Sequence, residues 1–113
     1  MIRRGEIWWS ALAEAVGSGA RFRRPVLIVQ SNDFSDSAIR TTICAVVTSN
    51  LHLAEAPGNV RLARRATGLK QESVVNVSQL ITLDKRLLTT RTGRVSAETL
   101  RDVEAGIKLV LAL

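Results

Sequence analysis

The pattern of apolar and polar residues predicts a chain made mostly of short strands. Residues 5–10 are predicted to form a strand, since their side chains divide between two faces with a period of two. Residues 23–30 form a second apolar strand, and residues 41–47 are apolar on both faces, which is typical of a central strand. Further short strands are predicted near 59–62, 72–77, 80–83 and 93–95.

The last segment predicts an amphipathic helix. Ser96 is a suitable N-cap, and Glu98 suits the positive end of the helix dipole. One apolar stripe follows at helical spacing: Leu100, Val103, Ile107, Val110 and Leu111. Many short strands followed by one helix indicate a mainly β fold, a small curved SH3-like β-barrel with the C-terminal helix packed on it. We expect residues 1–113 to form a single domain.

Two polar segments interrupt this pattern. Residues 11–22 are predicted to be a loop with glycines at its centre, either a flap over a site or a plain connection. No helix-forming run follows these glycines, so they are not a dinucleotide-binding motif. Residues 31–39 are expected to form a turn-rich connection. In the first strand, Trp8 lies on the face opposite Ile7 and Trp9, where it could stack on a base, seal a subunit contact or sit under a loop.

The charge of the chain is strongly positive. Its formal net charge is +6 and its isoelectric point is near 11.0, and thirteen of its sixteen basic residues are arginine. Arginine binds phosphate through a planar, two-pronged set of donors, so polyanions are plausible partners. Arginine also replaces lysine in chains from GC-rich genomes, where the excess charge serves solubility only. Composition alone does not decide between these two interpretations.

Composition argues against several classes of site. The single cysteine, Cys44, excludes an intrachain disulfide, and its place among apolar residues predicts that it is buried. With one histidine and ten scattered carboxylates, neither a metal site nor a cofactor is predicted. No apolar run approaches the roughly 20 residues needed to cross a bilayer. The N-terminus does not resemble a signal peptide, and we expect a soluble protein of the cytoplasm.

The candidate chemistry stands at the ends of two apolar strands. Pro25 has no backbone donor, so it belongs at the start or the edge of its strand, and it pushes Arg24 toward extended geometry. Thr48 and Ser49 emerge at the end of the strand predicted over 41–47. A guanidinium that faces hydroxyls on a neighbouring strand is suited to binding and cleaving a phosphodiester.

Cleavage of RNA without a metal requires the 2′-hydroxyl to attack phosphorus, while charge is stabilised on the phosphoryl oxygens. Two histidines often share the proton transfers, but this chain has only His52, so that scheme is excluded. Arg24 is expected to stabilise the developing charge, because a guanidinium stays protonated and is a poor base. Thr48 is expected to hold a non-bridging oxygen or to orient the nucleophile. The plain alternatives are a surface arginine and a hydroxyl that caps the backbone.

Four motifs follow one another at residues 3–9, 24–30, 48–50 and 77–84, and Gly93-Arg94-Val95 precedes the C-terminal helix. In this order they resemble the MazF/PemK family of toxin endoribonucleases from bacterial toxin–antitoxin systems. The resemblance implies the same barrel fold, a homodimer, and cleavage of single-stranded RNA. It also implies an antitoxin partner, which we expect to be acidic and partly disordered because opposite charge steers association.

The resemblance also assigns roles to two residues. The family's catalytic arginine and threonine fall on Arg24 and Thr48 by their place in the motifs. The implied products are a 2′,3′-cyclic phosphate and a 5′-hydroxyl.

A further set of residues is predicted to contact the RNA. Asn50 and Gln79 are able to read base edges through their amides, and Arg23 to follow the phosphate backbone. His52 is a candidate acid or base, although a solvated loop residue explains it as well. The full set is Gly17, Ser18, Arg23, Ser49, Asn50, His52 and Gln79.

Two other functions stay open from the residues alone. A toxin of the same fold, of the CcdB kind, poisons DNA gyrase by binding and carries a tryptophan-glycine-isoleucine tail. This chain ends Val110-Leu111-Ala112-Leu113 instead, which favours the ribonuclease. The second alternative is a small-barrel RNA-binding module without catalysis.

Overall fold

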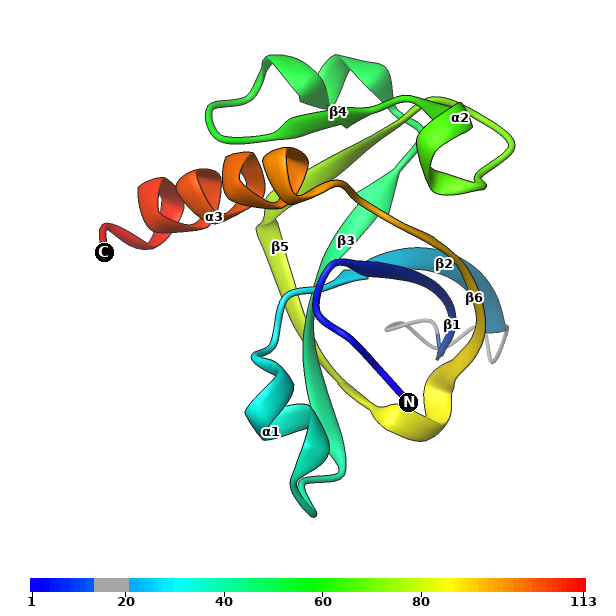
Figure 1. Ribbon diagram of the computed structural model, residues 1–113. Helices are drawn as coiled ribbons and strands as arrows, with labels where there is room; N and C mark the ends of the chain where they lie inside the picture. The colour runs from blue at the N-terminus through cyan, green and yellow to red at the C-terminus, as the bar shows by residue number, and fades with distance from the viewer. Residues whose placement is uncertain (14–20) are drawn as a thin grey trace.

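A computed structural model describes residues 1–13 and 21–113 and shows a strongly curved sheet with a helix packed against it (Figure 1). The strands are β1 (Glu6–Ala13), β2 (Arg21–Ile28), β3 (Thr41–Thr48), β4 (Val60–Leu62), β5 (Ser73–Asp84) and β6 (Leu88–Arg94). The helical segments are α1 (Asn32–Asp36), α2 (Arg64–Thr67), α3 (Ala97–Leu111) and two short 3₁₀ helices, η1 (Leu51–Glu55) and η2 (Lys85–Leu87). None of the helices in these residues is long and apolar enough to cross a membrane.

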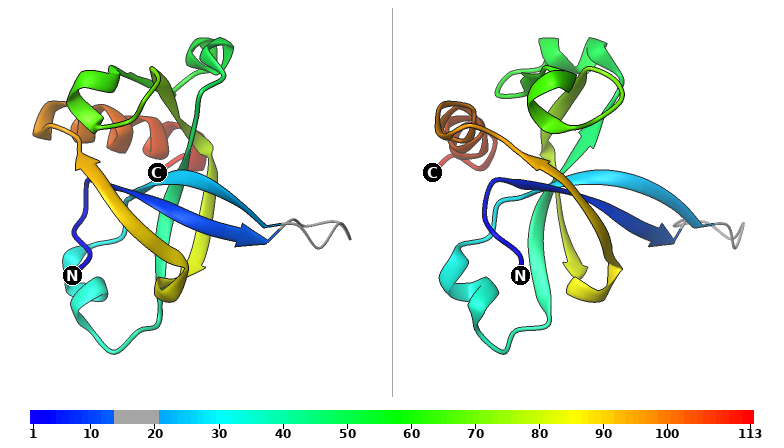
Figure 2. Two further views of the ribbon diagram at one scale, coloured as in Figure 1. Left: turned by 90° about the vertical axis from the view of Figure 1, so that its right-hand side faces the viewer. Right: turned by 45° about the vertical axis from the view of Figure 1, so that its right-hand side comes forward.

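The described strands form one sheet in the order β4-β5-β3-β2-β1-β6, and each pair of neighbours is antiparallel. The sheet curls until β6 meets α2, which follows β4 at the opposite edge (Figure 2). This contact is closed by the Thr92 hydroxyl, which donates to the carbonyl oxygen of Thr67 at 3.0 Å. The predicted fold class, mainly β with a small curved barrel and a C-terminal helix, is confirmed, and the barrel is partly closed.

The sheet buries apolar side chains on both faces, because β2 and β3 lie in its middle and are apolar at successive positions. One cluster lies between the sheet and α3 and consists of Ile7, Leu27, Ala45, Val47, Leu62, Leu69, Val75, Val77, Val95 and Val103. The other cluster fills the opposite face and consists of Val26, Ile28, Cys44 and Leu83, with Trp8 and Leu88 among the side chains packed on it. The prediction that Cys44 is buried is therefore confirmed.

The face of β1 that carries Trp8 is covered, so of the three possibilities for Trp8 the structure shows packing beneath another segment. Trp8 packs against the second cluster, and its indole N–H donates to the Glu6 carboxylate at 3.1 Å. Ser10 on the same face is fully buried. The cause is the curl of the sheet, which brings η2 and β6 over a face that a flat sheet would leave in water.

Several elements differ in extent from the prediction. The loop expected over 11–22 is shorter, because β1 continues to Ala13 and β2 begins at Arg21. The connection over 31–39 contains the short helix α1, whose N-cap is Ser31. The final strand is also longer, since β6 covers seven residues.

The two strands predicted at 72–77 and 80–83 are a single strand, β5, with an irregularity in its middle. Ala45 pairs with Leu80 whereas its neighbour Val46 pairs with Asn76, so three extra residues of β5 bulge out between them. Ser78 and Gln79 in this bulge are polar, as turn residues often are. The sequence pattern therefore predicted two strands where the structure has one.

Helix α3 begins as predicted, with the Ser96 hydroxyl accepting the backbone N–H of Thr99 at 3.1 Å. Val103 is completely buried, and Leu100 and Ile107 pack beside it on the first cluster. The later part of the predicted stripe is not covered. Four apolar residues at this end are exposed: Leu109, Val110, Leu111 and Leu113.

A buried hydroxyl on β3 gives the first testable prediction. Thr42 is fully buried, and its Oγ1 has no hydrogen-bond partner in the described residues. A valine at this position has nearly the same shape without the unpaired polar atom, so we expect Thr42→Val to raise the free energy of unfolding by about 1 kcal/mol and the melting temperature by roughly 5 °C. Thermal unfolding measures this. Thr82→Val, on the exposed position of β5 that pairs with Ile43, is the control and is expected to change little. A lower melting temperature for Thr42→Val would show that the hydroxyl is satisfied.

A buried carboxylate joins β1 to β6. Glu6 is only 2% exposed and accepts from the backbone N–H of Arg3 at 2.8 Å, the Arg91 guanidinium at 2.9 Å and the Trp8 indole at 3.1 Å. Desolvation is the largest single influence and acts to raise the pKa of Glu6. The hydrogen bonds from Arg3, Arg91 and Trp8 and the charge of Arg91 together outweigh it, so the pKa is lowered from 4.5.

Because the folded state lowers this pKa, Glu6 stabilises the fold fully above about pH 4.5, and the contribution is lost as the pH falls through the lowered value. We expect Glu6→Gln to reduce the free energy of unfolding by about 2 kcal/mol at neutral pH and the deficit to shrink below pH 4 to 5. Urea unfolding across this range is the measurement, with exposed Glu55→Gln as the control. An equal deficit at every pH would rule out the ionised carboxylate as its cause.

Candidate active site

A gap between β2 and β3 creates a polar concavity among the described residues. The two strands are paired only as far as Val26 and Val46. Pro25 comes next and has no backbone N–H with which to extend the ladder. Two residues beyond the last pair, the same register brings Arg24 opposite Thr48, and both side chains project to the face of Val26 and Val46. The end of strand pairing therefore sets a guanidinium across a gap from a hydroxyl.

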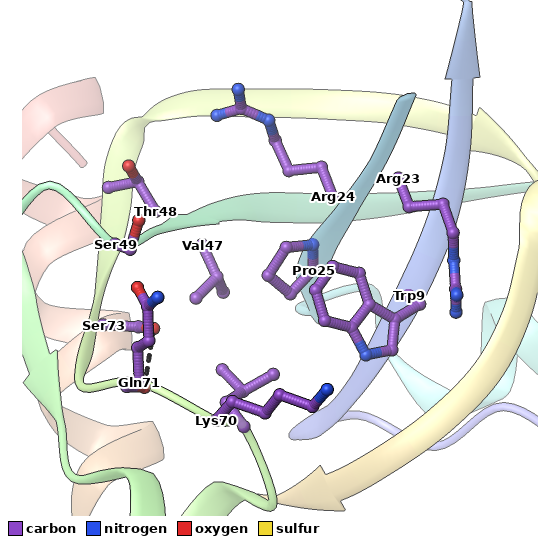
Figure 3. Close-up of a pocket in the computed structure, with 11 residues that line it drawn as sticks. Trp9, Arg23, Arg24, Pro25, Val47, Thr48, Ser49, Lys70, Gln71 and Ser73 are labelled. Carbon is purple, nitrogen blue, oxygen red and sulfur yellow. Dashed lines mark hydrogen bonds between the residues drawn. The ribbon is translucent and has the colours of Figure 1, made fainter. Parts of the chain in front are cut away.

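This gap opens into a cleft of about 350 Å³, within the size range of ligand sites (Figure 3). Its apolar lining consists of Trp9, Pro25, Val47 and Leu69, and all of these except Pro25 belong to or pack on the cluster under α3. Its polar lining consists of Arg23, Arg24, Thr48, Ser49, Lys70, Gln71 and Ser73. Among these described residues three are cationic and none is acidic, so the cleft suits an anionic ligand that has an apolar part.

The far wall of the cleft is held in place by a close approach of two backbones. Gly68 ends α2 with a φ of +75°, and a Cβ at this position would lie 2.3 Å from the Thr92 carbonyl oxygen. Only glycine fits this combination of conformation and contact. The chain therefore leaves α2 directly along the cleft, where Lys70 and Gln71 follow, and the Ser73 hydroxyl donates to the Gln71 carbonyl oxygen at 3.2 Å.

One hydrogen bond fixes the backbone of Arg24, and another fixes the side chain of Thr48. The buried Ser10 hydroxyl donates to the Arg24 carbonyl oxygen at 2.8 Å, which anchors the backbone from which the guanidinium extends. In Figure 3 the Arg24 side chain reaches from β2 toward the end of β3, where Thr48 and Ser49 lie. Thr48 Oγ1 accepts the backbone N–H of Asn50 at 3.1 Å. This contact uses a lone pair and leaves the hydroxyl proton available to a ligand.

The sequence and the geometry were compared with known proteins. The chain matches, over residues 3–111, the family model of the PemK-like, MazF-like toxins of type II toxin–antitoxin systems. The chain belongs to this toxin family. An endoribonuclease MazF6 from Mycobacterium tuberculosis (strain ATCC 25618 / H37Rv) is 45% identical over 113 residues, covering 100% of this chain and 99% of the relative. Endoribonuclease EndoA from Bacillus subtilis (strain 168) is 30% identical and covers 100% and 97%.

Solved structures of MazF proteins have the same fold. The Mycobacterium tuberculosis toxin MazF-mt6 aligns with a TM-score of 0.79 and 20% identity, over 96% of this chain and 97% of that one. A MazE–MazF complex from Deinococcus radiodurans aligns with a TM-score of 0.78 and 20% identity, over 99% and 96%. The resemblance inferred from the four sequence motifs is thus confirmed over nearly the whole chain.

In this MazF-like toxin the cleft brings together part of the predicted site. Four of the predicted residues line it: Arg23, Arg24, Thr48 and Ser49. Gly17 and Ser18 lie outside the described residues. The other three predicted contacts are not among the cleft-lining residues, and each has a place elsewhere in the fold.

Two of these three side chains have structural partners. The Asn50 side chain caps η1 by accepting the His52 backbone N–H at 3.2 Å, and His52 itself is exposed on η1. Gln79 is exposed in the bulge of β5 and accepts from the Asn76 amide at 2.9 Å. Roles for these residues in binding RNA stay predictions.

The single cysteine of the toxin, Cys44, is unsuited to nucleophilic chemistry. Desolvation by burial raises the pKa of its thiol to about 12. Within residues 1–13 and 21–113, no three His, Cys, Asp or Glu side chains are grouped so as to hold a metal ion.

The sequence-based prediction missed the wall opposite Arg24 and the aromatic floor. Trp9 was expected only to face the core, yet its indole also lines the cleft. Lys70 and Gln71 belong to the connection after α2 and Ser73 begins β5, and this segment carries no catalytic motif. The one available signal was Gly68, because a glycine after a short polar helix often marks a sharp change of direction.

Proposed function

We propose that this protein is the endoribonuclease of a type II toxin–antitoxin system and that it cleaves single-stranded RNA in the cleft between β2 and β3. The observation that carries the proposal is the position of Arg24 opposite Thr48 in a cationic cleft. It is supported by family membership and by 45% identity to a relative named as an endoribonuclease. A cytoplasmic location, where RNA is available, is part of the same proposal.

The reaction follows from the two facing groups. The 2′-hydroxyl of the substrate gives up its proton to water as its oxygen attacks the adjacent phosphorus, the bond from phosphorus to the 5′-oxygen breaks, and that oxygen takes up a proton from water. The products are a 2′,3′-cyclic phosphate and a 5′-hydroxyl, and no metal ion is required. Arg24 supplies positive charge and donors to the phosphoryl oxygens, an effect worth about 3 to 4 kcal/mol for one preorganised donor. The Thr48 hydroxyl donates a hydrogen bond to a non-bridging oxygen, since its own oxygen already accepts the backbone N–H of Asn50.

The two alternative functions have less support. Relatives that are 45% and 30% identical are named endoribonucleases, which disfavours a toxin that acts only by binding gyrase. A non-catalytic RNA-binding module does not need a guanidinium and a hydroxyl that face each other across a gap.

A cleavage assay tests the proposal. Purified protein incubated with a long single-stranded RNA in EDTA is expected to yield defined fragments whose 5′ ends accept phosphate from polynucleotide kinase without prior dephosphorylation. Retardation of the RNA without cutting would indicate a binding module.

We expect Arg24→Ala and Thr48→Ala each to lower the cleavage rate by at least about 100-fold while the fold is retained.

Matched substitutions separate this effect from a general loss of charge or hydroxyl. Arg40→Ala removes an exposed arginine and Thr82→Ala an exposed threonine, both outside the cleft-lining set, and both are expected to cleave at the wild-type rate. Wild-type rates for Arg24→Ala and Thr48→Ala would refute the assignment of these residues.

We further propose two protein partners. A second copy of the chain is expected to cover the exposed end of α3, where Leu109, Val110 and Leu111 face solvent in the single chain. An acidic, partly disordered antitoxin is expected to cover the cationic cleft, as the family description and the net charge of +6 suggest.

The charge argument predicts salt-sensitive inhibition. Raising the salt concentration from about 0.1 to about 1 M shortens the Debye length from roughly 10 to 3 Å. We therefore expect the affinity of the cognate antitoxin, measured by calorimetry, to fall at least about tenfold over this range. Affinity independent of salt would instead indicate a mainly apolar interface.

A further inference from the structure

The apolar side of the cleft is an aromatic surface with a cation on one side. The Arg23 guanidinium lies over the Trp9 indole, 5.2 Å from the ring centroid. Figure 3 shows Arg23 on the side of the indole away from Val47 and Thr48. This cation–π contact, together with the pairing of Trp9 and Pro25, holds the ring in one orientation. Such a fixed ring beside an open cleft is a stacking surface for a flat, uncharged group.

The opposite wall supplies a separate positive charge. Lys70 is exposed and follows Gly68, whose contact with Thr92 fixes the direction of the chain at this point. In Figure 3 Lys70 lies across the cleft from Arg24, and its side chain extends toward Trp9. None of the ion pairs among the described residues involves Lys70. Its charge is therefore not neutralised by a carboxylate of residues 1–13 or 21–113.

A ligand that matches both walls has a flat apolar part and phosphates on two sides. Arg24 and Thr48 are placed to hold one phosphate, and Lys70 is placed across the cleft from Arg24 to meet another. A nucleotide next to the scissile phosphate has this composition, because its base is planar and its second phosphate lies one nucleotide farther along the strand.

We propose that Trp9 and Lys70 form a subsite for the nucleotide that adjoins the scissile phosphate. The base stacks on the Trp9 indole, whose far side is occupied by Arg23, and Lys70 neutralises the outer phosphate of that nucleotide. This inference rests on the proposed ribonuclease function for the position of the scissile phosphate. Both residues bind and position the substrate, and neither takes part in proton transfer.

The experiment uses the Thr48→Ala protein, which is expected to bind RNA without cutting it. The probes are a single-stranded RNA that spans a cut site mapped with the wild-type protein and a DNA strand of the same sequence, which has no 2′-hydroxyl and cannot be cut. Affinity is measured over a series of salt concentrations. Adding Lys70→Ala is expected to reduce the slope of log affinity against log salt by about 0.7, the value for one lost phosphate contact on a single strand. Lys108→Ala removes the same charge from an exposed position on α3 and is expected to leave the slope unchanged.

Stacking is tested separately through Trp9. In the Thr48→Ala protein with Trp8→Phe, the remaining indole is Trp9, and we expect its fluorescence to be quenched when either strand binds. Trp9→Leu is expected to weaken binding by about 5- to 150-fold. Because Trp9 also packs on the core, circular dichroism must show that this variant is folded, and the quenching result stands without it.

The outcomes separate this inference from the proposed function. Unchanged salt slope in Lys70→Ala, or unquenched Trp9 fluorescence at saturating RNA, would overturn the subsite even if RNA is cleaved through Arg24. If the wild-type protein cuts no RNA, the DNA strand and an unmapped RNA of mixed sequence serve as probes. Quenching and a reduced slope with these probes would support the subsite while the ribonuclease function fails.

Discussion

The candidate site depends on one missing hydrogen-bond donor. Pro25 has no N–H, and the pairing of β2 with β3 ends at the next residue, Val26. On the paired side of this point the strands are buried on both faces and cannot separate. On the other side they diverge, and the residues facing each other across the gap are Arg24 and Thr48. The opening is thus part of the folded sheet and needs no movement to form.

Contacts made by β1 keep this opening in a fixed shape. β1 supplies Ser10, which holds the Arg24 carbonyl oxygen, and Trp9, which forms part of the cleft floor. β1 is held in turn to β6 by the buried Glu6 carboxylate and the Arg91 guanidinium. A charge-stabilising group contributes most when it is oriented before the reaction begins, so these contacts bear on catalysis as well as on stability.

The sequence predicted the fold class and the two facing residues because both depend on local signals. A proline after Arg24 and hydroxyls after an apolar strand are visible without knowledge of the topology. The cleft's far wall was not predictable in this way, because Lys70 reaches the site through the contact between α2 and β6. The sequence did not decide the packing of Trp8 for a related reason, since alternation along a strand does not reveal that a sheet curls back over its second face. Asn50 and Gln79 have side chains suited to reading bases, but the structure shows that each also makes a local hydrogen bond.

The composition left two interpretations of the positive charge, polyanion binding and solubility, and the positions of the basic side chains bear on this choice. Five arginines form ion pairs with carboxylates among the described residues: Arg3, Arg4, Arg61, Arg86 and Arg91. These pairs involve five of the sixteen basic residues of the chain and tie segments of the fold together. Arg23 and Lys70 form no such pair and line the same cleft as Arg24. If the excess charge served solubility alone, three cationic side chains would have no reason to gather around an apolar, aromatic floor. This distribution favours a polyanion with planar groups as the ligand of the cleft.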